Sequence, residues 1–114
     1  MTGPVKVGFG PAENMPGMAV EYMSFGPEGQ AVPPPFKGSR FLVPPGATSE
    51  PDEHAVAEIW LVRSGTGTVL SAGSRTHIGP GDALYYPPWV PHQVTSTGED
   101  PLEVFSLWWT PQPQ

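Results

Sequence analysis

Glycine and proline interrupt this sequence so often that no long helix can run through it. The 114 residues include 14 glycines and 17 prolines, and no hydrophobic pattern of helical period continues for a useful length between them. Proline fixes φ and has no N–H to donate, while glycine readily adopts turn conformations. We therefore predict an all-β fold in which the glycines and prolines lie in many turns.

The hydrophobic content indicates that the chain folds despite these residues. Chains rich in glycine and proline can be disordered, but 38% of this chain is hydrophobic and only 14% is charged. Four tryptophans, five phenylalanines and three tyrosines can each bury a large apolar area. A chain of 114 residues is long enough for one domain and too short for two, so we expect a single domain over 1–114.

The charge and the absence of cysteine exclude several classes of protein. Five basic residues against eleven acidic ones give a net charge of −6, which disfavours binding to a nucleic-acid backbone. Without cysteine there is no disulfide scaffold, thiolate zinc site or cysteine nucleophile. No apolar run is long enough for a signal peptide or a membrane span. We expect a soluble, cytoplasmic protein that binds neither nucleic acid nor membranes.

Short strands bounded by turn residues recur through the second half of the chain. Residues 1–36 are expected to form an extended N-terminal arm with a first strand at its centre, and residues 40–110 the barrel core. The spacing of strands and turns favours a β-sandwich or barrel. The predicted strands cover 18–25, 40–43, 54–63, 66–71, 75–78, 83–86, 92–97 and 102–110.

Metal-ligand side chains gather in two places. Asp52, His54 and Glu58 have the two-residue periodicity of one strand face, and His92 follows a proline-stiffened loop. Two histidines and a carboxylate suit Zn²⁺, or Fe²⁺ with open positions, whereas a hydrogen-bonded polar core without metal is the alternative. Asp52 is a fourth ligand or a turn cap. Glu58 and Asp52 are the candidate catalytic carboxylates, since Glu58 can act as general base if Asp52 replaces it on the metal.

Four further residues are candidates for contacting the substrate, which we expect to be a small polar molecule. Trp60 shares the predicted strand face of the ligands, and Tyr86 and Trp108 each belong to an aromatic pair of which one member faces inward. Arg40 either clamps a substrate carboxylate or lies at the surface. His77, outside both clusters, is expected to be a surface residue.

The first cluster lies in a motif with defined spacing. Gly46 is followed after five residues by Asp52-Glu53-His54, after three more by Glu58, and after six more by Gly65. The pattern resembles the first motif of the cupin superfamily, which is Gly, five residues, His-any-His, three or four residues, Glu, six residues, Gly. In this chain an aspartate stands where the motif has its first histidine.

The second cluster resembles the second cupin motif. Gly81 is followed after five residues by Pro87-Pro88-Trp89, after two more by His92, and after three more by Ser96. The motif itself is Gly, five residues, Pro-any-Gly, two residues, His, three residues, Asn. Trp89 thus replaces a glycine, which predicts a different loop backbone, and Ser96 replaces the terminal asparagine.

The resemblance implies a cupin-type double-stranded β-helix, a jelly-roll barrel that usually holds a metal. The ligands it implies are His54, Glu58 and His92, with Asp52 beside them. The implied metal is a divalent ion, with Zn²⁺ favoured and Fe²⁺ or Mn²⁺ as alternatives. Cupins often cover strand edges by exchanging N-terminal strands, so a homodimer is expected.

A narrower resemblance concerns the run from Asp52 to Trp60 together with 91–94 and 105–109. These stretches look like the zinc-binding cupin portion of bacterial hydrazine-forming enzymes. That resemblance implies zinc-assisted N–N bond formation in biosynthesis, from an N-hydroxylated amine and an amino acid, with a separate synthetase-like partner. The alternatives are a cupin-type non-heme iron oxygenase and a non-catalytic small-molecule or metal-binding cupin.

Overall fold

The chain folds into ten short β-strands in the computed structural model, which describes residues 3–26 and 34–112. The strands are β1 (Gly8–Phe9), β2 (Glu13–Met15), β3 (Met18–Ser24), β4 (Lys37–Val43), β5 (Ala57–Ser64), β6 (Gly67–Ser71), β7 (Ser74–Ile78), β8 (Ala83–Tyr86), β9 (Gln93–Ser96) and β10 (Leu102–Trp109). Within the described residues, no helix is long and apolar enough to cross a membrane. The predicted all-β class is confirmed.

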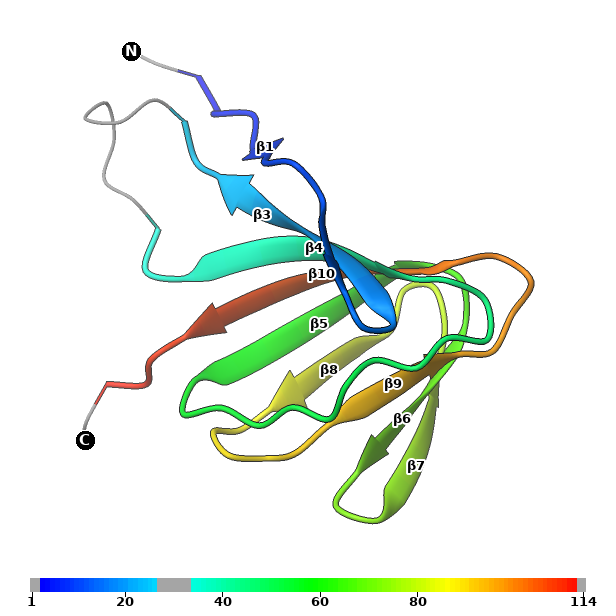
Figure 1. The fold of residues 1–114 in the computed structure, drawn as a ribbon. Helices are drawn as coiled ribbons and strands as arrows, with labels where there is room; N and C mark the ends of the chain where they lie inside the picture. The colour runs from blue at the N-terminus through cyan, green and yellow to red at the C-terminus, as the bar shows by residue number, and fades with distance from the viewer. Residues whose placement is uncertain (1–2, 27–33, 113–114) are drawn as a thin grey trace.

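The strands pair antiparallel in two sheets that face each other around the core (Figure 1). The larger sheet has the order β1-β3-β4-β10-β5-β8, with β2 beside β3, and the smaller sheet has the order β7-β6-β9. Two isolated bridges, Thr48–Thr95 and Asp52–His92, attach the 44–56 segment to the strand segment that includes β9. The result is the expected jelly-roll barrel.

The N-terminal segment is part of the barrel wall where the structure describes it. β3 pairs with β4 from Ala19–Leu42 to Tyr22–Ser39, and β2 folds back on β3 as a hairpin. The segment expected as an extended arm therefore contributes three strands, of which only β3 was anticipated. Residues 27–33 of that arm lie outside the described residues.

The hairpin between β2 and β3 sits tightly against the 44–56 segment. Gly17, in its turn, has a φ of 77°, a conformation that costs a residue with a Cβ about 1–2 kcal/mol. A Cβ at Gly17 would also collide with the carbonyl group of Thr48. Glycine is thus required here for two independent reasons.

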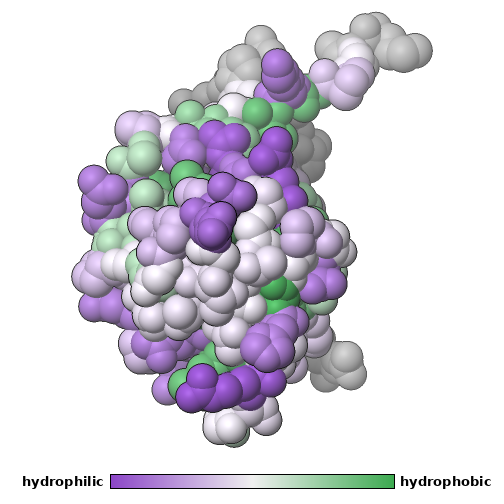
Figure 2. Space-filling view, turned by 90° about the vertical axis from the view of Figure 1, so that its right-hand side faces the viewer, coloured by the Kyte–Doolittle hydropathy of each residue, from purple (hydrophilic) through white to green (hydrophobic). Residues whose placement is uncertain are grey.

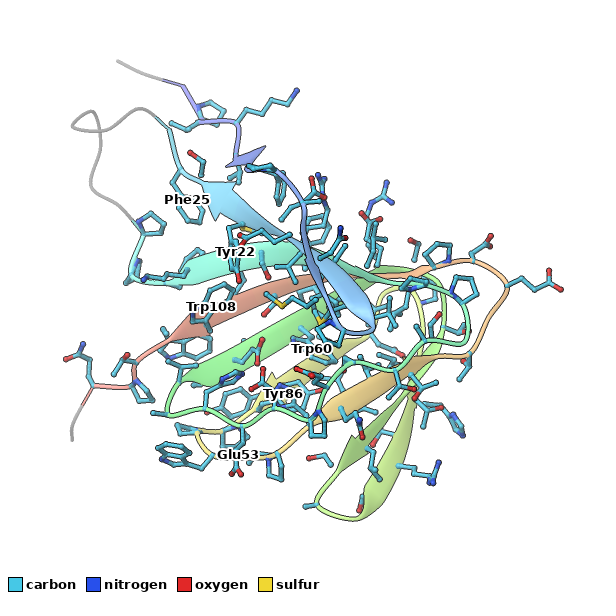
Figure 3. The ribbon with its side chains drawn as sticks, in the orientation of Figure 1. Tyr22, Phe25, Glu53, Trp60, Tyr86 and Trp108 are labelled. Carbon is cyan, nitrogen blue, oxygen red and sulfur yellow. The ribbon has the colours of Figure 1, made fainter. Side chains whose placement is uncertain are left out.

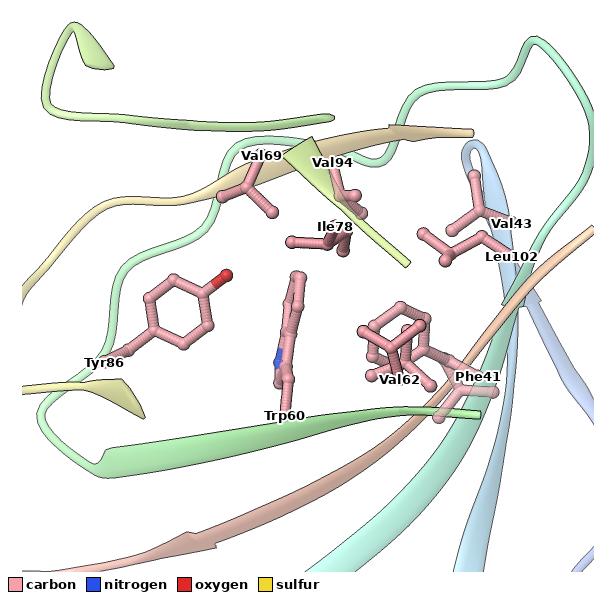
Figure 4. Packing of buried hydrophobic residues seen from close by; sticks show 11 residues of the cluster. Phe41, Val43, Trp60, Val62, Val69, Ile78, Tyr86, Val94 and Leu102 are labelled. Carbon is pink, nitrogen blue, oxygen red and sulfur yellow. The ribbon is translucent and has the colours of Figure 1, made fainter. Parts of the chain in front are cut away.

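The core lies between the sheets and contains aromatic rings in edge-to-face contact (Figure 4). The Trp60 ring is 5.1 Å from that of Phe41 and 4.9 Å from that of Tyr86, at interplanar angles of 66° and 67°. Each fully buried large side chain contributes about 1.5–3 kcal/mol to folding. Seen from the side in Figure 2, the surface is mostly hydrophilic or neutral, with small hydrophobic patches.

Candidate metal centre and its cavity

Backbone pairing brings the two predicted clusters together. The Asp52 N–H donates to the His92 carbonyl (2.9 Å), and the His92 N–H donates to the Asp52 carbonyl (2.8 Å). The Trp89 N–H in turn donates to the carbonyl of His54 (2.6 Å). These three bonds hold residues that are far apart in the chain at a fixed separation.

Three metal-ligand side chains converge at this junction. Asp52, His54 and His92 each place one ligand atom within 4.8 Å of the others. Asp52 Oδ2 lies 3.1 Å from His54 Nε2, and the two imidazole rings are 5.6 Å apart. A carboxylate oxygen and two imidazole nitrogens form a donor set suited to Zn²⁺ and to other first-row divalent metals.

Glu58 lies beside this group and uses its two oxygens differently. Oε2 accepts hydrogen bonds from the Trp60 indole N–H (3.0 Å) and the Ser106 hydroxyl (2.5 Å). Oε1 is 3.3 Å from His92 Nε2 and 4.0 Å from His54 Nε2. It is buried, and no described residue gives it a hydrogen bond of good geometry. A buried carboxylate oxygen without a partner is costly, and a cation beside it removes that cost.

The backbone carbonyl of Val90 fixes the orientation of the His92 ring. Nδ1 is 3.1 Å from the carbonyl oxygen of Val90, and because a carbonyl can only accept, Nδ1 must carry a proton. In neutral His92 the lone pair of Nε2 therefore faces the Oε1 of Glu58, so two acceptors meet unless a proton or a metal ion lies between them. The residues present thus fit a divalent metal ion.

Burial and polar contacts act in opposite directions on the pKa values of Glu58 and His92. Burial alone would raise the pKa of the Glu58 carboxyl, but the hydrogen bonds from Ser106 and Trp60 and the nearby His92 imidazole outweigh it and lower the pKa. Burial would likewise lower the pKa of His92, but the nearby Glu58 carboxylate and the hydrogen bond to the Val90 carbonyl outweigh that effect and raise it. Both shifts favour the charged form of each group when no metal is bound, although Oε1 of Glu58 still has no hydrogen bond of good geometry.

Tyr86 packs against the imidazole ring of His92. Its ring lies 4.3 Å from that of His92 at 30°, and its side chain is buried. Burial, together with the charge of Glu58, raises the pKa of the Tyr86 hydroxyl, so it stays neutral. Tyr86 is not among the described residues that line the cavity, and its contact with a substrate stays a prediction.

A cavity of about 410 Å³ opens next to the donor group. Trp60 and Trp108, both predicted to contact a substrate, line it; Tyr22, Trp60 and Trp108 are labelled in Figure 3 along the larger sheet. Its volume is at the lower end of the range of about 300–1,000 Å³ for small-molecule sites. Further apolar walls come from Met15, Met18, Val20, Phe41, Val56 and Val94.

Arg40 does not face this cavity. Ser39 and Phe41 line it, so Arg40 between them points to the outer face of β4. There its guanidinium donates to both carboxylate oxygens of Glu21, at 3.0 and 3.1 Å, and lies 3.9 Å from the centre of the Phe9 ring. In the structure Arg40 therefore binds a carboxylate of the protein itself, outside the cavity, and not one inside it.

The loop at Trp89, where the motif has glycine, has a left-handed backbone. Trp89 has a φ of 67°, a conformation that glycine adopts easily. Trp89 holds this conformation under local strain, and its indole is largely exposed. His77 is exposed, as expected, and its Nδ1 is 3.1 Å from the Thr68 hydroxyl.

Sequence reasoning missed the residues that hold the ligands in place. Ser106 could have been predicted from the alternation of inward and outward side chains in β10. Val104, Ser106 and Trp108 share the inward face, and a lone serine on that face needs a hydrogen-bond partner. No sequence feature indicates that the Val90 carbonyl would orient His92. The hairpin residues Met15 and Met18 were hidden because the N-terminal arm was expected to stand apart from the barrel.

Comparison with known proteins places this architecture. The model of the cupin domain family matches residues 39–109. Among solved structures, the chain is similar to a cupin 2 conserved barrel domain protein from Salinispora arenicola CNS-205, with 28% identity and a TM-score of 0.75 over 87% of this chain and 81% of that one. It is also similar to the plu4264 protein of Photorhabdus luminescens, with 18% identity and a TM-score of 0.76 over 87% and 80% of the two chains.

An enzyme is among the structures with the same fold. A point mutant of salicylate 1,2-dioxygenase from Pseudoaminobacter salicylatoxidans superposes with a TM-score of 0.73 and 23% identity, over 86% of this chain and 28% of that one. At this level of identity the likeness concerns the fold alone. Since the family model covers more than half of the sequence and the barrel and both motif segments agree with it, the chain belongs to the cupin domain family.

Proposed function

We propose that this protein is a metal-dependent enzyme that acts on a small molecule in the barrel cavity, with a divalent metal held by Asp52, His54, Glu58 and His92. The observation that carries the proposal is the unsatisfied, buried Oε1 of Glu58, which lies 3.3 Å from the Nε2 of His92 beside a cavity of about 410 Å³. A structural polar core would satisfy that oxygen with a hydrogen bond.

The chain's own residues prepare the site for chemistry. A divalent metal bound there would supply Lewis acidity toward an oxygen or nitrogen of the substrate. Trp60 and Ser106 hold one oxygen of Glu58 so that the other stays aimed at the imidazoles. With a metal at Oε1, both oxygens of Glu58 would be engaged, whereas the Asp52 side chain is 57% exposed. We therefore assign proton exchange between substrate and solvent to Asp52 rather than to Glu58.

Elemental analysis of the purified protein tests this proposal. We expect one divalent metal per chain in the wild type and loss of that metal in His92→Ala, because a direct ligand is gone. His77→Ala is the matched control, since His77 is exposed, lies in β7 and does not line the cavity. Circular dichroism shows whether each variant keeps its fold. Stoichiometric metal in a folded His92→Ala protein would refute the proposed site.

The two reactions that the resemblance suggests place different demands on the cavity. Zinc-assisted N–N bond formation needs a place for the carboxylate of an amino acid, and among the described lining residues none is Lys or Arg. That reaction would need a synthetase-like partner to hold the carboxylate. Iron-dependent oxygenation needs no such partner. Bound iron with oxygen consumption would favour oxygenation, and bound zinc without it would favour the N–N reaction.

A further inference from the structure

The charged side chains that line the cavity near the donor group are nearly all acidic. Besides the two histidines they are carboxylates, from Glu50, Asp52 and Glu58. With three carboxylates and a divalent metal, the site keeps a net negative charge. Around the buried Glu58, where the dielectric constant is lower, this charge repels an anion more strongly than it would in water.

Every lysine and arginine of the protein lies outside the lining of this cavity. The sequence has five Lys and Arg residues, all in the described part of the chain, and none lines this cavity. Arg40 is paired with Glu21 on the outer face, and Arg63 with Glu103 (2.7 Å). Lys37 lines a second cavity of about 330 Å³, which shares Tyr22 and Trp108 with the first, and Lys37 itself does not line the first cavity. None of these lysines and arginines is therefore at hand to bind a carboxylate or phosphate group.

The remaining walls suit a flat, apolar body. Phe41, Trp60, Tyr22 and Trp108 supply aromatic rings, and the last two meet edge to face with centroids 6.3 Å apart. Aromatic faces also attract cations, by about 0.5–2 kcal/mol per contact. Met15 and Met18, from the β2–β3 hairpin, add adaptable thioether side chains.

We propose that the cavity selects a molecule with an apolar body of one or two rings and a neutral or cationic head group, and that it rejects carboxylates. This inference rests on the proposed function, because the head group is assigned to the end of the cavity that carries the metal donors. It replaces the expectation of a small polar substrate held by an arginine.

Three matched probes test the inference: phenethylamine, 2-phenylethanol and phenylacetate. Binding is followed by ¹H–¹⁵N NMR at the Trp60 and Trp108 indole signals, with and without Zn²⁺, and the signals are assigned with Trp60→Phe and Trp108→Phe. We expect saturable shifts for the amine and the alcohol, and binding of phenylacetate that is weaker by roughly tenfold or more. Equal binding of phenylacetate, or no binding of any probe at millimolar concentration, would overturn the inference.

A pair of charge reversals supplies the control. Glu50 lines the cavity. The nearby Glu53, labelled in Figure 3, does not line it and is exposed. Both Glu→Lys changes alter the net charge equally, but only Glu50→Lys should strengthen phenylacetate binding and weaken phenethylamine binding. Equal effects of the two variants would contradict the inference.

The outcomes separate this inference from the proposed function. Metal binding without discrimination between the probes would overturn the inference and leave the metal site standing. Discrimination between the probes in a protein that takes up no metal would refute the metal site and leave the charge selection of the cavity standing.

Discussion

Glu58 is a buried residue of the protein core and, in our proposal, also a metal ligand. One of its oxygens is engaged by Trp60 and Ser106, and the other is left for the imidazoles of His54 and His92. The anchoring matters because an ionised carboxylate is tolerated in a core only when its oxygens have partners. The partner of Oε1 is, in this account, the metal.

Replacing Glu58 by glutamine tests the need for its charge. Glu58→Gln has nearly the same shape and can still accept hydrogen bonds from Trp60 and Ser106, but its amide is a poorer metal ligand. We expect metal affinity to fall by about tenfold or more, measured by competition with a chelator. An unchanged affinity in a folded variant would show that Glu58 is not a ligand.

Ser106 should act through Glu58 as a positioning residue. Ser106→Ala removes one donor from Oε2, so we expect metal affinity to fall by about tenfold and stability to fall by about 1 kcal/mol. Ser96→Ala is the matched control: Ser96 is also buried, yet no described residue accepts or donates a hydrogen bond at its hydroxyl. If both variants bind metal equally well, Ser106 has no role in positioning.

Trp89 offers a test of local strain. Trp89→Gly and Trp89→Ala both remove the exposed indole, but only glycine adopts a φ near 67° without strain. The glycine variant should therefore be more stable than the alanine variant by about 1 kcal/mol in urea denaturation. Equal stability would mean that the loop relaxes to another conformation.

At the scale of elements, the 52–56 segment shows that the ligand residues were predictable although the start of the strand was not. The predicted strand 54–63 begins only at Ala57, and Asp52 ahead of it pairs with His92, just before β9, in an isolated bridge. Asp52, His54 and Glu58 nevertheless all face the cavity. Motif spacing carried that information, whereas nothing local in the sequence indicates the bridge.

The β2–β3 hairpin should control access to the cavity without touching the metal. Gly17 and Gly46 have nearly the same φ, 77° and 78°, but only at Gly17 would a Cβ strike neighbouring backbone. Gly46→Ala should therefore cost about 1 kcal/mol, and Gly17→Ala clearly more, because the hairpin must also move. We expect Gly17→Ala to weaken phenethylamine binding while metal binding persists. Equal stability and equal phenethylamine binding in Gly17→Ala and Gly46→Ala would contradict a role of the hairpin in access to the cavity.

At the scale of the whole molecule, the barrel presents sheet edges and apolar residues on its outer face. β1 and β8 are the ends of the larger sheet, and Leu61 and Tyr85 are 42% and 59% exposed. Exposed edges favour pairing with a second chain, so we keep the prediction of a homodimer. Light scattering after gel filtration should give about twice the chain mass of 12.2 kDa. A mass equal to one chain at micromolar concentration would contradict it.

The central claim is that one divalent metal joins the two cupin motif segments inside the barrel. Anomalous X-ray diffraction from crystals grown with Zn²⁺, recorded on both sides of the zinc absorption edge, tests it most directly. The account predicts one strong peak per chain, about 2.0–2.2 Å from His92 Nε2 and from Glu58 Oε1, with His54 and Asp52 completing the set. A peak elsewhere, or no peak beside an intact Glu58–His92 ion pair, would contradict it.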